Sequence, residues 1–417
     1  METRKIDNLL LNVSTFLVLC VALIRPYLTT IFKLDSITVV FLSVAIFLTL
    51  IILCSRNKIK FNKNYIILCI LYLIPFFYNN AYVQDKIWTR FFSYLFTIIY
   101  FILYYLCLPK EKNTNMVLKL IISFSIITSI VTWIGFLFPD IYVKKIVTLL
   151  PSNDIVDVLK SFPNVNPGLT NHYSRNAFFI VIGIMASMIF YLKNKQKKDL
   201  FLISFLVLSL FLVGKRGHLL FLIISFILTY IIYNKIGVKT CIKLLLLGLV
   251  VVSLSIFAIK YIPGANTTYE RILRKSTSDD ISTGRFEMYE DIYEMYKQNN
   301  YTPIGWSQYA SSTSYHHPGV HNDYIQLFCE TGIIGTIIIV GINLIMLIRS
   351  INFSRKDSSK FYFLAIIYNI FFMTYSLTGI PHYDVELYIM YFFVNTVMYL
   401  LSNKYLSNLK GEQVCKE

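Results

Sequence analysis

The sequence predicts an all-helical integral membrane protein with about twelve transmembrane helices. Two observations lead to this prediction. Of the 417 residues, 56% are hydrophobic and 15% are charged, and the mean hydropathy of +0.60 is too apolar for a water-soluble domain. Apolar segments long enough to cross about 30 Å of hydrocarbon also recur along nearly the whole chain. We therefore expect a single polytopic membrane domain over residues 1–417.

The predicted spans leave two long connecting loops. The spans cover residues 9–31, 36–54, 64–82, 90–108, 115–138, 173–192, 199–213, 218–234, 240–261, 324–348, 360–379 and 384–402. The long loops lie at residues 139–172 and 262–322, directly before the sixth and tenth spans. Since binding and catalytic residues concentrate in loops held by a rigid scaffold, we expect function there.

The distribution of basic residues predicts the orientation of the chain. With the N-terminus inside, the basic clusters fall in cytoplasmic segments, as the positive-inside rule requires. They comprise Arg4, Lys5, Arg56, Lys58, Lys60, Lys63, Lys193, Lys195, Lys197, Lys198, Arg349, Arg355, Lys356 and Lys360. Both termini are then cytoplasmic, and the two long loops face outside. The net charge of +16 suits an anionic inner leaflet and is no evidence for nucleic-acid binding.

One motif in the second long loop carries chemistry. His321-Asn322 is followed by nine residues and then by Gly332-Ile333-Ile334-Gly335, at the start of the tenth span. A neutral imidazole can accept a proton from a sugar hydroxyl, and an amide can orient a polar substrate. The two glycines would let a neighbouring helix or a lipid chain approach closely. On residue type alone, a histidine at a helix start is more often a cap or a surface residue.

An amphipathic helix is predicted shortly before this motif, from Arg285 onward, because tyrosines and acidic residues recur at helical spacing. We expect it to lie against the outer surface of the membrane. Arg285 at its start opposes the helix dipole, by about 0.3–1 kcal/mol, unless an anion lies nearby. This unfavourable position of Arg285 indicates a phosphate group nearby. The alternative is that Arg285 forms an ion pair with Glu287. Trp306 and the loop tyrosines are candidates for stacking on sugar rings.

Two further basic sites stand at predicted outer helix ends. Lys215 and Arg216 occupy a short turn with no acidic neighbour, against the positive-inside trend. A diphosphate would suit them, since a guanidinium can bond two of its oxygens at once. The alternative is a miscounted span, which would make both cytoplasmic anchors. His172 and Arg175 close the first long loop as candidates for sugar or phosphate contact, or as a polar collar of the sixth span.

A metal site is not indicated. His316 and His317 precede His321 and could suggest zinc, but none of the seven cysteines falls in a large outer loop. They lie in predicted spans, at span edges or in the C-terminal tail, so no disulfide is expected either. We expect no metal and no cofactor.

His-Asn, nine residues and Gly-x-x-Gly together resemble the signature of the O-antigen ligase and O-antigen or capsule polymerase superfamily. The order of features over about residues 160–350 is similar too, including Gly168 to Asn176. The resemblance implies a GT-C-like, metal-independent glycosyltransferase of the bacterial inner membrane. Its donor would be a glycan on undecaprenyl diphosphate. The resemblance also implies that Arg216 and Arg285 hold the diphosphate.

On this basis we expect a polysaccharide polymerase that extends a lipid-linked repeat unit outside the inner membrane. His321 would take the proton from the acceptor hydroxyl, and the residues expected to contact substrate are Asn322, Lys215, Arg175, His172 and His317. The first alternative is an O-antigen ligase that transfers the glycan to lipid A-core or a protein. The second is a polysaccharide transporter or flippase. A chain-length regulator and a flippase are the expected protein partners, besides membrane lipids.

Overall fold

The computed structural model describes residues 2–32, 36–55, 63–77, 85–109, 111–147, 166–170, 172–234, 285–311, 319–357 and 359–414. Within these ranges the regular structure is helical and contains no strand, which confirms the all-helical prediction.

Eight of the described helices are long and apolar enough to cross a membrane. They are α1 (Glu2–Phe32), α2 (Ile37–Cys54), α4 (Asp85–Leu106), α5 (Glu111–Leu137), α8 (Tyr173–Asn194), α10 (Arg216–Asn234), α14 (Asp323–Ser354) and α16 (Val385–Val414). Three shorter helices also coincide with predicted spans: α3 (Lys63–Phe77), α9 (Lys197–Val213) and α15 (Phe361–Tyr375). The predicted ninth span, 240–261, lies outside the described residues. The number twelve therefore stays a prediction.

The chain divides into two compact units. Unit 1 comprises Met1–Val117, Gly284–Ala365 and Phe372–Glu417, and unit 2 comprises Leu118–Thr283 and Ile366–Phe371. The expectation of one membrane domain over residues 1–417 also stays a prediction.

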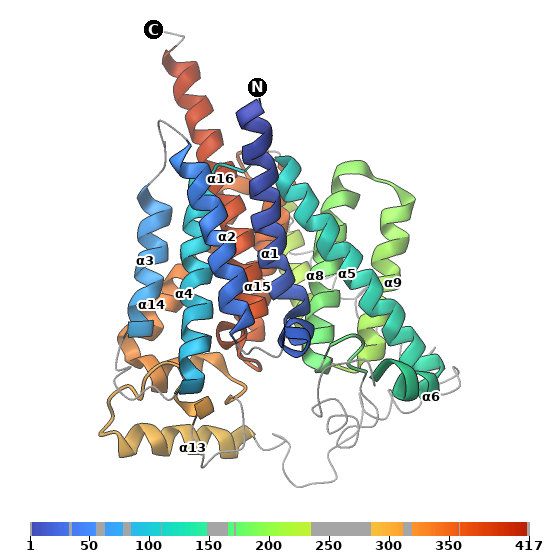
Figure 1. Ribbon diagram of the computed structural model, residues 1–417, viewed down its shortest axis with the longest axis vertical. Coiled ribbons are helices and arrows are strands. Elements are labelled where there is room, and N and C mark those ends of the chain that lie inside the picture. Colours follow the sequence, from blue (N-terminus) through green and yellow to red (C-terminus); the bar gives the residue numbers. More distant parts are fainter. Residues whose placement is uncertain are drawn as a thin grey trace. The chain divides into compact units, whose positions relative to one another are not determined.

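Unit 1 is a helix bundle closed at one end by a crossing helix. In it α2 packs on α1 and α4, α16 packs on α4, and α14 packs on α3. Figure 1 shows both chain termini at one end of this bundle and α13 (Arg285–Gln298) lying across the opposite end, which we call the α13 end. The predicted helix from Arg285 is therefore present. It buries Met288 and Ile292 against α14, while Tyr293 stays exposed.

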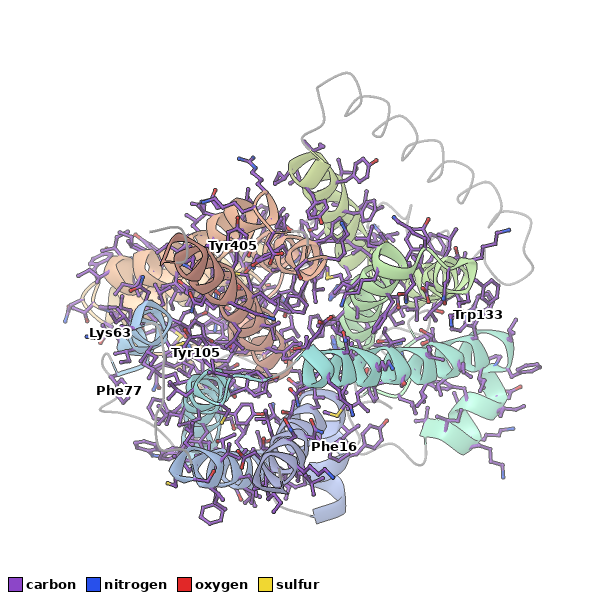
Figure 2. All side chains as sticks on the ribbon, turned by 90° about the horizontal axis from the view of Figure 1, so that it is seen from above. Phe16, Lys63, Phe77, Tyr105, Trp133 and Tyr405 are labelled. Atoms are coloured by element: carbon purple, nitrogen blue, oxygen red, sulfur yellow. The ribbon has the colours of Figure 1, made fainter. Side chains whose placement is uncertain are left out.

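The outer surface of the bundle is apolar. Figure 2 shows the side chains seen along the helices, with Tyr105 inside unit 1 and Phe16 and Phe77 on its outside. Phe77 is 59% exposed, whereas Tyr105 is 2% exposed. Phe201 in unit 2 is 77% exposed. Because soluble monomers rarely expose contiguous apolar surface on this scale, these faces require lipid.

Unit 2 contains α5, α8, α9 and α10, with the short helices α6 (Pro139–Ile141) and η2 (Tyr142–Ile146) following α5. α8 packs against α9 and α10. α9 ends at Val213, where Gly214 adopts a φ of 74° that only glycine reaches at little cost, and α10 begins at Arg216. Lys215 and Arg216 therefore lie in a tight turn between two apolar helices, as predicted.

α14 is broken at Gly332, inside the predicted motif. Gly332 has φ 71° and ψ 178°, a conformation that is nearly exclusive to glycine. The carbonyls of Cys329 and Glu330 just before the break accept hydrogen bonds from the Ile304 and Gly305 amides of the preceding loop, at 3.1 and 3.0 Å. A Cβ on Gly332 would lie 2.7 Å from Cγ of Pro303 in the same loop. The first glycine therefore allows the helix to open and the loop to dock.

The second glycine of the motif lets a neighbouring helix approach. A Cβ on Gly335 would lie 3.2 Å from Cβ of Pro75 in α3 and closer still to the Thr331 side chain. The expected close approach at Gly335 is therefore confirmed, and its partner is α3.

We predict that Gly332→Ala destabilises the protein by about 1–3 kcal/mol, because alanine at this conformation is strained and its Cβ collides with Pro303. The matched control is Gly341→Ala in the same helix, where an added Cβ meets nothing within 4 Å. It should be neutral or slightly stabilising, since alanine favours helix. Thermal unfolding in detergent compares the two variants. Equal melting temperatures would show that the break at Gly332 is not needed.

Candidate active site

The predicted base, His321, sits immediately before the N-terminus of α14. Its φ of 57° places it in the left-handed region, which few residues with a side chain adopt and which is enriched at active sites. The side chain of His321 is half-buried. The histidine of the motif is therefore held at the α13 end of unit 1.

Asn322 caps α14. Its Oδ1 accepts hydrogen bonds from the backbone amides of Tyr324 and Ile325, at 3.1 and 3.2 Å. The predicted role of Asn322 was substrate binding, and the cap occupies its side-chain oxygen. Its side-chain amide group is then the part that can donate to a substrate.

Asp323, the next residue, anchors this helix start in the bundle. Its backbone amide donates to the carbonyls of Ser376 and Gly379, in the connection between α15 and α16. Its carboxylate oxygen Oδ2 accepts from Oγ of Ser376 at 3.1 Å and from the amide of His382 at 3.0 Å. His382 belongs to the short helix η5 (Pro381–Tyr383). These bonds position the backbone that carries His321.

The ring of His382 extends the same network. Its Nδ1 lies 2.6 Å from Oδ2 of Asp323, and its Nε2 lies 3.0 Å from Nδ2 of Asn343. Since the Asn343 amide nitrogen is a donor, Nε2 accepts and Nδ1–H donates to the carboxylate. Asp323 and His382 are 0% and 2% exposed, so the pair is buried. Such an oriented histidine resists rotation and stiffens the connection between α14 and η5.

A second buried carboxylate, Glu330, holds the loop before the motif. It accepts from the amides of Ser307 and Tyr309, at 2.6 and 3.1 Å, and from Nε2 of Gln326 at 3.2 Å. Oγ of Ser307 in turn accepts from Nη1 of Arg90 in α4, at 2.7 Å. The loop is thereby tied to two helices of unit 1.

Trp306 is part of this packing, and the prediction that it stacks on a sugar is wrong. Only 1% of Trp306 is exposed, and its ring lies 4.5 Å from Tyr94 and 5.4 Å from Tyr383, centroid to centroid. Burial, and next the charge of nearby Glu330, raises the pKa of Tyr383 well above its ordinary value. Tyr383 therefore stays protonated at physiological pH.

Arg285 begins α13 and is half-buried. Met288 and Ile292 of this helix form a cluster with Val320 and Cys329, which places α13 beside the residues that flank His321. The alternative, an ion pair between Arg285 and Glu287, is not seen among the described residues. The anion that would offset the conflict between Arg285 and the helix dipole stays a prediction.

The other predicted cations gather in unit 2, at two neighbouring helix N-termini. His172 caps α8 by accepting from the Ser174 amide at 3.1 Å. Nζ of Lys215 lies 4.6 Å from the centre of the Tyr173 ring, so the start of α8 and the turn before α10 are in contact. Arg216 is exposed as the first residue of α10. Helix N-termini and cations both favour negative charge, which makes this cluster suited to phosphate.

Each unit therefore contains its own share of the predicted site. Arg175 joins the unit 2 cluster from the first turn of α8. Unit 1 carries His321, Asn322 and Arg285 together with Gly332 and Gly335. His316 and His317 lie outside the described residues. In the part of the chain that the structure describes, no group of three or more histidine, cysteine or acidic side chains is arranged to hold a metal ion.

The sequence reasoning missed the buried network below the motif. Asp323 follows the motif directly, and Glu330 is a charge within the predicted tenth span, a position that is functional by default. Both signals were present in the sequence. No signal in the sequence indicated the partner of Asp323, because His382 lies 59 residues further along and nothing in its spacing indicates the pairing.

Comparison with known proteins gives a family match over part of the chain. Residues 200–340 match the family model described as O-antigen ligase. The matched segment contains the basic turn at Lys215, helix α13 and the His321 motif. The resemblance to the O-antigen ligase and polymerase superfamily is therefore confirmed over these residues. No curated protein matches the chain. Together with the eight apolar helices, the match indicates an integral inner-membrane protein with a function of the O-antigen ligase or polymerase type.

We predict that His382→Ala destabilises the protein by about 1–3 kcal/mol, because it removes the Nδ1–H group that donates to the buried Asp323 carboxylate. The control is His172→Ala, which removes a helix cap worth about 0.5–2 kcal/mol. Unfolding of the purified variants in detergent measures both. A cost for His382→Ala no greater than that for His172→Ala would refute the anchoring role of the pair.

Proposed function

We propose that this protein is a polysaccharide polymerase. It transfers a growing glycan from undecaprenyl diphosphate to a lipid-linked repeat unit, and the α13 end of unit 1 faces outside the inner membrane, with both termini in the cytoplasm. The observation that carries the proposal is the placement of His321. A histidine in a strained conformation, held above a buried hydrogen-bond network, coincides with the motif of a matching family.

In the proposed reaction, Nδ1 or Nε2 of His321 accepts the proton of the acceptor hydroxyl. The hydroxyl oxygen then forms a bond to the anomeric carbon of the donor. The bond from that carbon to the diphosphate oxygen breaks, and undecaprenyl diphosphate leaves with the electron pair. Direct displacement inverts the configuration at the anomeric carbon. The Nδ2 group of Asn322 orients the acceptor.

The departing diphosphate needs positive charge in the transition state. Arg285 of unit 1 and Arg216 of unit 2 are proposed to supply it, because both begin helices and neither has an acidic partner among the described residues. Lys215 and Arg175 add to the positive potential of the unit 2 cluster, and His172 and His317 are proposed as further substrate contacts. In this proposal guanidinium groups carry the phosphate charge without a metal ion or cofactor.

The choice of polymerase over ligase rests on the number of basic sites. Each of the two long outer loops carries basic residues, which suits two substrates that both carry a lipid diphosphate. The alternative is an O-antigen ligase, whose acceptor is lipid A-core or a protein. Deletion phenotypes separate the classes, because loss of a polymerase leaves single capped repeat units, loss of a ligase leaves none, and loss of a flippase traps the donor inside. A flippase and a chain-length regulator are the proposed partners.

We predict that His321→Ala abolishes polymer while membrane abundance stays normal. General-base catalysis contributes about 10²–10⁴ in rate, so the polymer ladder should vanish. His321→Gln keeps a side chain that can hydrogen-bond but cannot take up the proton near neutral pH, and it should be equally inactive. Chains of normal length from the glutamine variant would mean that His321 only positions the acceptor.

We further predict that Arg216→Lys impairs polymer formation although it keeps the charge, because lysine cannot make the two-pronged contact to a diphosphate. Arg216→Ala should be worse. The control is Arg355→Lys, an exposed residue at the far end of α14, which should leave activity unchanged. Wild-type amounts of polymer from both Arg216 variants, at matched protein abundance, would show that Arg216 is a topological anchor.

A further inference from the structure

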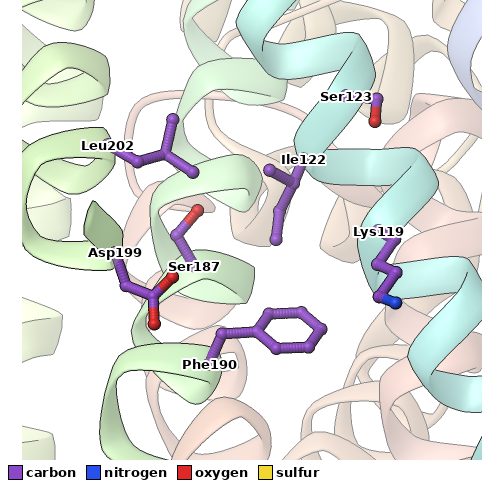
Figure 3. Close-up of a pocket in the computed structure, with 7 residues that line it drawn as sticks. All are labelled: Lys119, Ile122, Ser123, Ser187, Phe190, Asp199 and Leu202. Atoms are coloured by element: carbon purple, nitrogen blue, oxygen red, sulfur yellow. The ribbon is translucent and has the colours of Figure 1, made fainter. Parts of the chain in front are cut away.

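Unit 2 contains a pocket, lined by both polar and apolar side chains, that the proposed reaction does not use. It has a volume of about 300 Å³ and lies between α5, α8 and α9 (Figure 3). Its polar lining consists of Lys119, Ser123, Ser187 and Asp199. The rest is apolar, from Ile122, Phe190 and Leu202. A pocket that has opposite charges and an apolar lining, on a helix surface that faces lipid, is suited to an amphiphilic ligand.

Two buried polar atoms of this pocket lack hydrogen-bond partners. Ser187 is 1% exposed, and its Oγ has no partner among the described residues. Oδ2 of Asp199 is likewise buried and without a partner in that part of the chain. Buried polar atoms are nearly always hydrogen-bonded, and a carboxylate oxygen is costly to leave bare. A ligand in the pocket that carries N–H or O–H donors would satisfy both atoms.

The position of the pocket indicates where that donor comes from. Ser187 lies seven residues before the end of α8 at Asn194, or roughly 10 Å along the helix. Asp199 lies in the first turn of α9, and the connection between the two helices carries Lys193, Lys195, Lys197 and Lys198. The pocket thus lies close to the ends of α8 and α9 and beside a basic connection. This position corresponds to the depth of lipid headgroups.

The charges of the pocket select among headgroups. Asp199 offers a negative group on one wall, and Figure 3 shows Lys119 on the opposite side, on α5. A ligand that satisfies both walls is a zwitterion whose cation donates hydrogen bonds. The ammonium of an ethanolamine phospholipid has three N–H donors for Asp199 and Ser187, and its phosphate can reach toward Lys119. A choline headgroup has the same charges but no N–H, and phosphatidylglycerol has no cation.

We infer that this pocket binds the headgroup of an ethanolamine phospholipid, with the acyl chains lying along Phe190 and Leu202. The inference concerns a separate site and does not depend on the proposed glycan transfer. If the pocket binds this headgroup, one lipid class stays with the protein on purification and stabilises the packing of α5, α8 and α9.

The experiment uses the purified full-length protein in detergent, stripped of lipid and titrated with dioleoyl phosphatidylethanolamine, phosphatidylcholine or phosphatidylglycerol. Native mass spectrometry counts the lipids retained. Because charge-assisted hydrogen bonds distinguish the ethanolamine headgroup, the wild type should retain it about tenfold better than the choline lipid of equal chain length. Equal retention of these two lipids, or stronger retention of phosphatidylglycerol, overturns the inference.

Variants locate the binding. Asp199→Asn removes the charge that holds the ammonium and should reduce the preference over choline to within about twofold. Lys119→Gln, an exposed substitution that spares the fold, should weaken both lipids equally. The matched control, Lys198→Gln, changes a lysine outside the pocket and should behave as wild type. Melting temperatures without lipid verify folding. An unchanged headgroup preference in Asp199→Asn would show that the lipid binds elsewhere.

Discussion

The break in α14 at Gly332 determines how the α13 end of unit 1 is built. A continuous helix would use the carbonyls of Cys329 and Glu330 internally, and the loop that ends in Trp306 would have nowhere to dock. Because only glycine tolerates the backbone conformation at the break, those carbonyls are free to accept the amides of Ile304 and Gly305. The Gly-x-x-Gly of the motif is therefore a structural requirement for the short helical segment that presents His321.

Two buried carboxylates stabilise that segment from below. Asp323 joins it to η5 through His382, and Glu330 joins it to the preceding loop through Ser307 and Tyr309. A buried carboxylate oxygen is costly to leave without a hydrogen bond, so the bonds to Oδ2 of Asp323 and to both oxygens of Glu330 constrain the geometry of the segment. His321 and its surroundings are thus pre-organised, as the proposed catalysis by positioning and proton transfer requires.

The sequence predicted the elements better than their junctions. Apolar segments marked the described membrane helices, and tyrosine spacing marked α13, because both signals are periodic and local. Residue spacing also placed His321 at a helix start and Lys215 and Arg216 in a turn between two helices, and both positions are confirmed. It did not identify the Asp323 and His382 pair, since the two residues meet only through tertiary packing. The role of Trp306 was predicted wrongly for a related reason. A tryptophan in a loop is expected to be accessible, but here the loop packs into the bundle and is held by Glu330.

In the proposed function, the protein transfers glycans from a lipid diphosphate to a second lipid-linked repeat unit. Purified protein with one synthetic undecaprenyl-diphosphate-linked repeat unit, and no other acceptor, tests it most directly through the chain length and linkage of the products. We expect a ladder of polymers with inverted anomeric configuration at each new linkage and release of undecaprenyl diphosphate. Donor that is consumed only after lipid A-core is added, or that is never consumed, would contradict the claim.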